Sequence, residues 1–176
     1  MSTLDTLIER NHVFIEQRFI PDQPLMPTLR TMVISCADPR VDPAHLLGLE
    51  PGEAVVIRNI GGRITPNTLQ TMGMLQTIAQ VEGINPGGAF NLIILQHTDC
   101  GITRLDGKPE LLANYFGIDK GDVNAKAISD PHAAVAADVI ALKSMGILPR
   151  TWLISGLVYD VHTGLVETVV SPDPVE

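Results

Sequence analysis

The chain has few aromatic residues, few cations and almost no cysteine. Its 176 residues include one Trp, two Tyr and four Phe, and 12 Lys and Arg stand against 20 Asp and Glu, giving a net charge of −8. A protein of this charge repels nucleic acid and anionic lipid, and so few aromatic rings do not make a surface for stacking bases. We therefore expect neither a nucleic-acid partner nor a membrane partner.

The sequence also lacks an apolar run near the roughly 18 residues that span a bilayer. Asp5, Glu9 and Arg10 interrupt the start of the chain, unlike the apolar core of a secretory signal. We expect a cytoplasmic protein, in which the two cysteines, Cys36 and Cys100, are thiols or metal ligands and not a disulfide.

The chain does contain a regular alternation of apolar segments, in which 45% of residues are hydrophobic. Its length predicts a single domain over residues 1–176. An amphipathic helix capped by Ser2 or Thr3, followed by a proline-rich connection, forms an N-terminal arm over residues 1–27. After the arm, short apolar runs predict strands at residues 32–34, 54–57, 92–95 and 152–154, with a turn at 85–88. Helical spacing predicts helices over 65–81 and after Pro131.

This alternation indicates an α/β fold with a central, mostly parallel sheet flanked by helices. Near the C-terminus, residues 157–161 and 165–170 flank His162-Thr163-Gly164, which predicts a hairpin and an antiparallel edge. Parallel sheets place ligand sites beyond the carboxyl ends of their strands. The functional residues are therefore expected at that edge of the sheet.

Two polar clusters follow buried strands directly: Cys36-Ala-Asp-Pro-Arg and His97-Thr-Asp-Cys100. Neighbouring strand ends lie roughly 5 to 10 Å apart, so Cys36, His97 and Cys100 can converge. A lone buried Cys or His is more often a packing residue. Both cysteines at strand ends, one of them three residues after a His, favour a zinc site that keeps a fourth position open.

Asp38 and Arg40 are two residues apart, so in an extended segment their side chains point the same way and can pair. The pair is either a structural ion pair or a catalytic one. We favour the catalytic interpretation, in which Arg40 keeps the Asp38 carboxylate off the metal and Asp38 accepts a hydrogen bond from water at the fourth position.

The sequence around the remaining histidines and around Gly61-Gly62 does not indicate a specific chemical role. Surface or packing roles are expected for the histidines outside these clusters, which are His12, His45, His132 and His162. Gly61-Gly62 lacks the spaced glycines or the lysine of a nucleotide-binding loop, and predicts a tight backbone approach near the site.

With these residues in place, the chain resembles the β-class carbonic anhydrases, in the compact branch that carries His-Thr-Asp-Cys-Gly. The resemblance runs over about residues 32–170. The matching segments are Cys36–Arg40, Gly48–Ala54, Ile57–Gly62, His97–Gly101 and Asp160–Gly164. One departure is Pro39, where the family more often has a small residue.

The resemblance implies that Cys36, His97 and Cys100 bind zinc and that Asp38 and Arg40 form the catalytic dyad. In a closed form, Asp38 would be a fourth metal ligand. The implied reaction is hydration of carbon dioxide to bicarbonate by a metal-bound hydroxide. A homodimer or homotetramer is also implied, with the N-terminal helix embracing the neighbouring subunit.

Two other functions use the same residues. Hydrolysis of carbonyl sulfide or carbon disulfide occurs within this family with the same ligands and dyad, and an apolar pocket discriminates such substrates by only about 1 to 3 kcal/mol. The third hypothesis is a zinc-binding protein without catalytic activity. The presence of both Asp38 and Arg40 argues against it, because a purely structural zinc site does not need an oriented pair of this kind.

Overall fold

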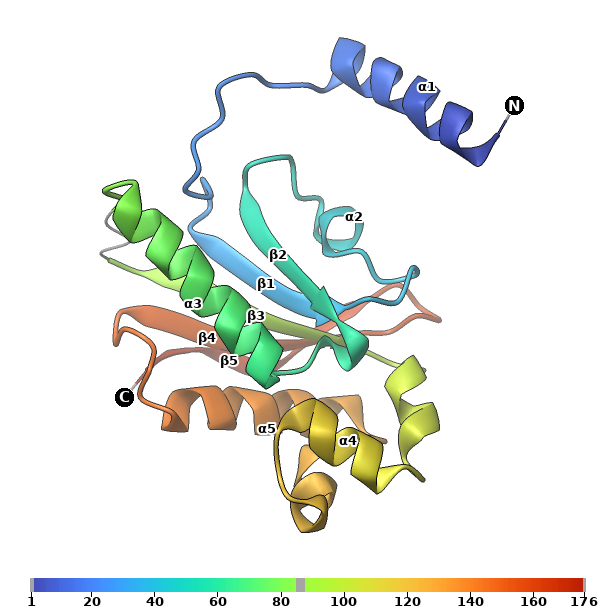
Figure 1. The fold of residues 1–176 in the computed structure, drawn as a ribbon, viewed down its shortest axis with the longest axis vertical. Helices are drawn as coiled ribbons and strands as arrows, with labels where there is room; N and C mark the ends of the chain where they lie inside the picture. The colour runs from blue at the N-terminus through green and yellow to red at the C-terminus, as the bar shows by residue number, and fades with distance from the viewer. Residues whose placement is uncertain (1, 85–87, 176) are drawn as a thin grey trace.

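The computed structural model describes residues 2–84 and 88–175 (Figure 1). Five strands form one sheet in the order β2-β1-β3-β4-β5, where the first four are parallel and β5 is antiparallel to β4. The strands are β1 (Thr31–Cys36), β2 (Ala54–Asn59), β3 (Phe90–His97), β4 (Trp152–Tyr159) and β5 (Val166–Pro174). The α-helices are α1 (Thr3–Gln17), α2 (Pro43–Leu47), α3 (Pro66–Val81), α4 (Pro109–Phe116) and α5 (Pro131–Ser144). The predicted fold class is confirmed.

The helix starts follow from local capping. The Ser2 side chain accepts the amide of Asp5, and Asp5 in turn accepts the amide of Ser2, so α1 begins with a capping box. Thr65 caps α3 in the same way, and the Asp130 side chain caps α5, which has a proline in its first turn. The three long helices therefore begin close to the predicted positions.

Helices α3 and α5 pack against the same face of the sheet. Alternate strand residues Ile34, Leu92 and Ile154 lie on one face, and they share a buried cluster with Met72 of α3 and Val135 of α5. All six residues of β1 are buried, as expected for a central parallel strand. The core therefore fixes the positions of β1 and β3, whose ends carry the predicted site.

The C-terminal hairpin differs in extent from its prediction. The expected strands 152–154 and 157–161 are one continuous strand, β4, which pairs with β5 through a shift in register near Gly156. Gly156 lies inside the strand, where it pairs with Ile94 of β3 and Val170 of β5. The antiparallel edge itself is confirmed. Of the turn predicted at 85–88, residues 85–87 lie outside the described residues.

The segment between β3 and α5 folds into α4 and two 3-10 helices, η2 (Gly101–Leu105) and η3 (Lys120–Lys126). The sequence shows no clear pattern over residues 105–129 of this segment. A second buried cluster forms there. Its members beside the two cysteines are Ile102, Leu112, Ala113, Phe116, Val123 and Ile128. This segment therefore supplies the apolar surroundings of Cys36 and Cys100.

Helix α1 stands apart from the rest of the fold at the end of an extended connection (Figure 1). None of its residues is buried, and its apolar side chains Leu4, Leu7 and Ile8 are at least half exposed. Within residues 2–84 and 88–175, no helix has the length and apolar character needed to cross a membrane.

Candidate metal centre

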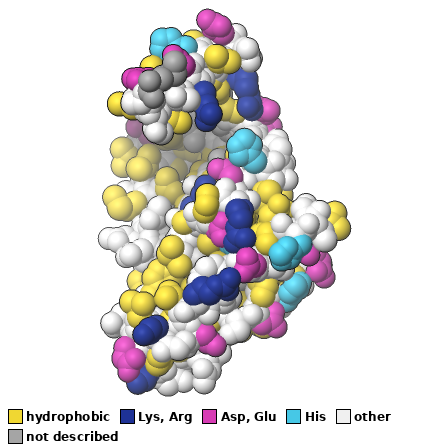
Figure 2. Space-filling model, turned by 90° about the vertical axis from the view of Figure 1, so that its right-hand side faces the viewer, with side chains coloured by type: hydrophobic (Ala, Val, Ile, Leu, Met, Phe, Trp, Pro, Cys, Tyr) yellow, Lys and Arg dark blue, Asp and Glu magenta, His cyan; other side chains and the backbone are white. Residues whose placement is uncertain are grey.

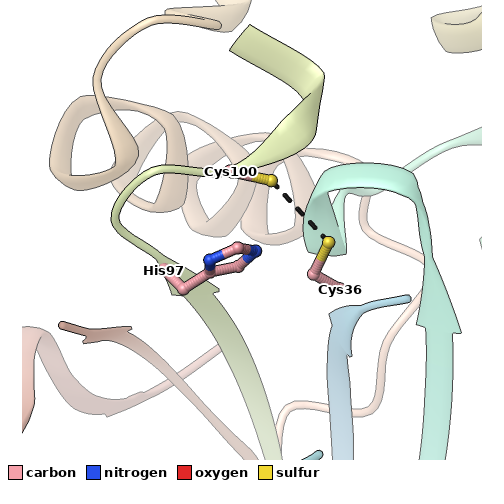
Figure 3. A group of neighbouring side chains, drawn as sticks. All are labelled: Cys36, His97 and Cys100. Atoms are coloured by element: carbon pink, nitrogen blue, oxygen red, sulfur yellow. Dashed lines mark hydrogen bonds between the residues drawn. The ribbon is translucent and has the colours of Figure 1, made fainter. Parts of the chain in front are cut away.

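The sheet brings the three predicted metal ligands together. Cys36 ends β1 and His97 ends β3, and these strands are parallel neighbours, so both side chains emerge at one edge. Cys100 lies in the turn after β3. One sulfur or nitrogen atom from each residue lies within 4.8 Å of the others, and all three residues are buried (Figure 3). The predicted convergence is therefore present in the structure.

The imidazole of His97 is oriented by the backbone. Its Nδ1 lies 2.8 Å from the carbonyl oxygen of Thr98, which fixes this nitrogen as the protonated one. The other nitrogen, Nε2, is fully buried and has no hydrogen-bond partner among the described residues. An unpaired buried acceptor costs folding free energy unless something binds it. Together with two sulfur atoms, this orphaned nitrogen fits a zinc ion, which prefers nitrogen and sulfur ligands.

The surroundings of Cys36 favour its thiolate form. The Sγ atoms of Cys36 and Cys100 are 3.7 Å apart, and the Cys36 sulfur also lies 3.4 Å from the amide of Asp38 and 3.3 Å from that of Gly61. Hydrogen bonding from Cys100 is the main cause that lowers the pKa of Cys36 to about 4, while the pKa of Cys100 is raised. A thiolate is the form that binds metal.

The two glycines after β2 allow the close backbone approach that the sequence predicts. Gly62 has φ +62°, and a Cβ there would lie 2.9 Å from the Leu95 carbonyl oxygen and 3.0 Å from the Cys36 amide nitrogen. No side chain fits between these backbones. Glycine at position 62 therefore lets the segment after β2 lie directly against the end of β1.

Asp38 and Arg40 pair beside the cluster. The Arg40 guanidinium donates from Nε to Asp38 Oδ1 at 3.0 Å and from Nη2 to Oδ2 at 2.8 Å, and the Arg40 amide also donates to Oδ1. These hydrogen bonds lower the pKa of Asp38 to about 2. Asp38 Oδ2 is 4.0 Å from His97 Nε2. The carboxylate thus lies next to the candidate ligands while it is bound to Arg40.

Two further residues support this arrangement, and sequence analysis assigned neither of them a role. Arg58 of β2 donates to the carbonyl oxygens of Cys36 at 2.9 Å and Asp38 at 2.7 Å. Asp99 accepts hydrogen bonds from Arg40 on its carboxylate and on its carbonyl, each at 3.0 Å. Both residues stand inside the recognised motifs, but only the tertiary structure shows which atoms they contact.

The other histidines lie outside the cluster. His132 contacts Glu167 at 3.1 Å, and both side chains are exposed. Among the described residues, the one group of three or more metal-binding side chains is Cys36, His97 and Cys100.

Basic and acidic side chains alternate on the face of the molecule at which the parallel strands end (Figure 2). Near the candidate site, Arg40 is about half exposed, and Arg104 binds Asp99 at 2.7 Å. Cys36, His97 and Cys100 themselves are all buried.

Comparisons with known proteins agree with this geometry. Residues 31–115 match the model of the family described as carbonic anhydrase. The chain is 33% identical over 115 residues to the mitochondrial β-carbonic anhydrase 6 of Arabidopsis thaliana, covering 57% of this chain and 37% of that protein. It is 31% identical over 163 residues to the carbon disulfide hydrolase of Saccharolobus solfataricus, covering 76% of this chain and 74% of that protein.

A solved structure agrees over almost the whole length. The crystal structure of carbonic anhydrase from Streptococcus mutans superposes with a TM-score of 0.71 at 30% identity, covering 96% of this chain and 98% of that chain. The chain spans little more than a third of the Arabidopsis relative but nearly all of the bacterial structure. Taken with the Cys-His-Cys geometry, these similarities show that the chain belongs to the β-class carbonic anhydrase family, which includes carbon disulfide hydrolases.

Proposed function

We propose that this chain hydrates carbon dioxide to bicarbonate with a zinc ion held by Cys36, His97 and Cys100. The observation that carries the proposal is the buried His97 Nε2, which has no hydrogen-bond partner among the described residues. A ring nitrogen of His97 and the two cysteine sulfurs lie within 4.8 Å of one another. A zinc ion with three protein ligands lowers the pKa of water from 15.7 towards about 7 and so makes a nucleophile available near neutral pH.

Asp38 would orient the attacking water. The Asp38 carboxylate, whose pKa Arg40 lowers to about 2, is ionised at neutral pH and acts only as a hydrogen-bond acceptor. Oδ2 is the Asp38 oxygen close to His97 Nε2, at 4.0 Å. A hydrogen bond to Oδ2 would turn a lone pair of the water oxygen towards the substrate carbon. Asp38 and Arg40 are therefore proposed as the catalytic dyad.

The surroundings suit a small uncharged substrate. The cysteines belong to a buried cluster with apolar side chains that include Ile102 and Phe116, so little water reaches them. A cavity of about 40 Å³ borders His97, Cys100 and Ile102, and its lining also includes polar side chains such as Gln96 and Thr103. The apolar part of this lining favours a small neutral molecule.

A second candidate function is hydrolysis of carbonyl sulfide or carbon disulfide. The 31% identity to a carbon disulfide hydrolase supports it, since that relative and this chain align over about three quarters of each. The same ligands and dyad would serve, and replacing oxygen by sulfur in an apolar pocket changes binding by only about 1 to 3 kcal/mol. A zinc-binding protein without turnover is a weaker alternative, because it would have no use for the bidentate Asp38–Arg40 pair.

We also propose that the active protein is a homodimer or homotetramer. Helix α1 presents Leu4, Leu7 and Ile8 to solvent, and an exposed apolar stripe on a helix indicates a missing contact. Packing of α1 on a second subunit would bury it. Two β-carbonic anhydrases of the same fold from Sordaria macrospora are tetrameric.

The test supplies purified, zinc-loaded protein with carbon dioxide and carbonyl sulfide in parallel, and follows proton release and hydrogen sulfide. We expect one zinc per chain, rapid carbon dioxide hydration, and a loss of at least a hundredfold in Asp38→Asn. Asp106→Asn makes the same charge change away from the dyad, where Asp106 binds Ser129, and is the matched control. Absence of stoichiometric zinc, or full turnover in Asp38→Asn, contradicts the proposal, and a strong preference for carbonyl sulfide selects the second candidate.

A further inference from the structure

Arg40 is shared between two carboxylates, only one of which belongs to the proposed dyad. Its Nε and Nη2 atoms bind Asp38, while Nη1 donates to the Asp99 carboxylate at 3.0 Å and Nη2 to the Asp99 carbonyl oxygen at 3.0 Å. The second carboxylate oxygen of Asp99 accepts Arg104 Nη2 at 2.7 Å. Opposite charges thus alternate along the series Asp38, Arg40, Asp99, Arg104, and their formal sum is zero.

The contacts of Arg40 join two separate turns. Asp38 and Arg40 lie in the turn after β1, whereas Asp99 lies in the turn after β3, between His97 and Cys100. Asp38 and Arg40 bind each other within one turn. The Arg40–Asp99 contacts join that turn to the segment at the end of β3 that carries His97 and Cys100. These contacts therefore help to set the position of the dyad relative to His97 and Cys100.

The backbone at Asp99 is also unusual. Its φ is +49°, in the left-handed region, which side-chain-bearing residues other than Asn and Asp seldom adopt. This conformation places the Asp99 carbonyl and carboxylate on the same guanidinium. Left-handed residues of this kind are frequent where a structure holds a functional geometry at a cost in backbone free energy.

We infer that Asp99 is a positioning residue, which holds the Arg40 guanidinium and thereby fixes the Asp38 carboxylate relative to His97 and Cys100. The inference rests on the proposed function, because it gives a role to a residue at the same site. Asp99 touches neither substrate nor metal in this role. It acts through Arg40, and its loss lets the turn that bears Asp38 shift against the turn that bears the ligands.

Two variants separate the carboxylate from the backbone conformation. Asp99→Asn keeps a residue suited to positive φ and retains one weaker acceptor, whereas Asp99→Gly removes the side chain and also tolerates φ +49°. We expect kcat per bound zinc to fall on the order of tenfold in Asp99→Gly and less in Asp99→Asn, with KM nearly unchanged, because a displaced catalytic group slows the reaction more than it weakens substrate binding. Asp106→Asn, with the same charge change, is the control.

A second measurement is independent of turnover. In protein labelled with nitrogen-15 at arginine, the Nη1 hydrogens of Arg40 should be distinct and slow to rotate in the wild type, because Asp99 holds them. They should become averaged in Asp99→Gly and stay distinct in Asp106→Asn. If Asp99→Gly only destabilised the fold and left the Arg40 contacts intact, the Nη1 hydrogens of Arg40 would stay distinct in that variant.

Equal kcat in Asp99→Gly and Asp106→Asn overturns the inference. An Arg40 spectrum that is the same in Asp99→Gly as in the wild type also overturns it, whether or not the variant retains zinc. Absence of turnover in the wild type is instead a failure of the proposed function, and the Arg40 spectrum alone then decides whether Asp99 positions this side chain.

Discussion

Asp138 accepts a hydrogen bond from Arg63 Nε at 2.7 Å, and neither side chain is more than 1% exposed. The same carboxylate accepts the amide of Ile64 at 3.2 Å and Gln96 Nε2 at 3.4 Å. Gln96 directly precedes His97, so this buried pair links α5 to the segment after β2 and to the end of β3. Through Gln96, the pair contacts the strand whose next residue is the candidate ligand His97.

Breaking this pair on one side should be costly. In Asp138→Asn the Arg63 charge stays buried without its partner, so we expect the free energy of unfolding to fall by about 3 to 5 kcal/mol in urea denaturation. The double variant Arg63→Met with Asp138→Leu removes both charges and should lose less. A loss in Asp138→Asn below about 1 kcal/mol would contradict a structural role for the pair.

The acidity of Asp38 should depend on Arg40. Hydrogen bonds from Arg40 lower the pKa of Asp38 from its ordinary 3.8 to about 2, so the ionised carboxylate stabilises the fold above pH 4, and this contribution is lost as the pH falls from about 4 to about 2. Carbon-13 titration of the Asp38 carboxyl should show a midpoint near 2. Arg40→Ala should raise the midpoint towards 3.8, and an unchanged midpoint would refute this cause.

Gly62 should not tolerate a side chain. At φ +62° a Cβ meets the backbone of Leu95 and Cys36 at 3.0 Å or less, so Gly62→Ala should lower the free energy of unfolding by about 2 kcal/mol and weaken zinc binding by displacing Cys36. Gly73→Ala is the control, because Gly73 lies inside α3 with nothing within 4 Å of a Cβ, and should stabilise the protein by about 0.5 to 1 kcal/mol. Equal effects of the two substitutions would show that the close approach at Gly62 is unimportant.

The apolar stripe of α1 should hold subunits together. Leu7 and Ile8 are 53% and 50% exposed in the single chain, so replacing both by Ser should shift the protein to a smaller species in sedimentation equilibrium without unfolding it. Arg10→Ser, an exposed polar change on the same helix, should leave the mass unaltered. If the wild type itself sediments as a monomer, the proposed oligomer is wrong.

Local patterns in the sequence predicted most of the framework of this protein. Capping residues such as Ser2 and Thr65 mark helix starts through contacts within four residues, and apolar runs mark buried strands. The convergence of Cys36 with His97 was also predictable, because parallel strands end at one edge of a sheet. The sequence did not predict that two expected strands join into β4, because only the pairing with β3 and β5 shows that Gly156 lies inside the strand.

Sequence alone thus indicated the long helices, the central strands and the candidate ligands, since these depend on neighbouring residues or on the parallel sheet, but it did not indicate α4, η2 or η3. Tertiary structure decided which charges meet: Arg40 with Asp99 across 59 positions, and Arg63 with Asp138 across 75. It also decided that the segment after β3 encloses the cysteines. Which charged side chains pair depends on their distance in the folded structure, and the periodicity of the sequence does not predict the distance between residues far apart in the chain.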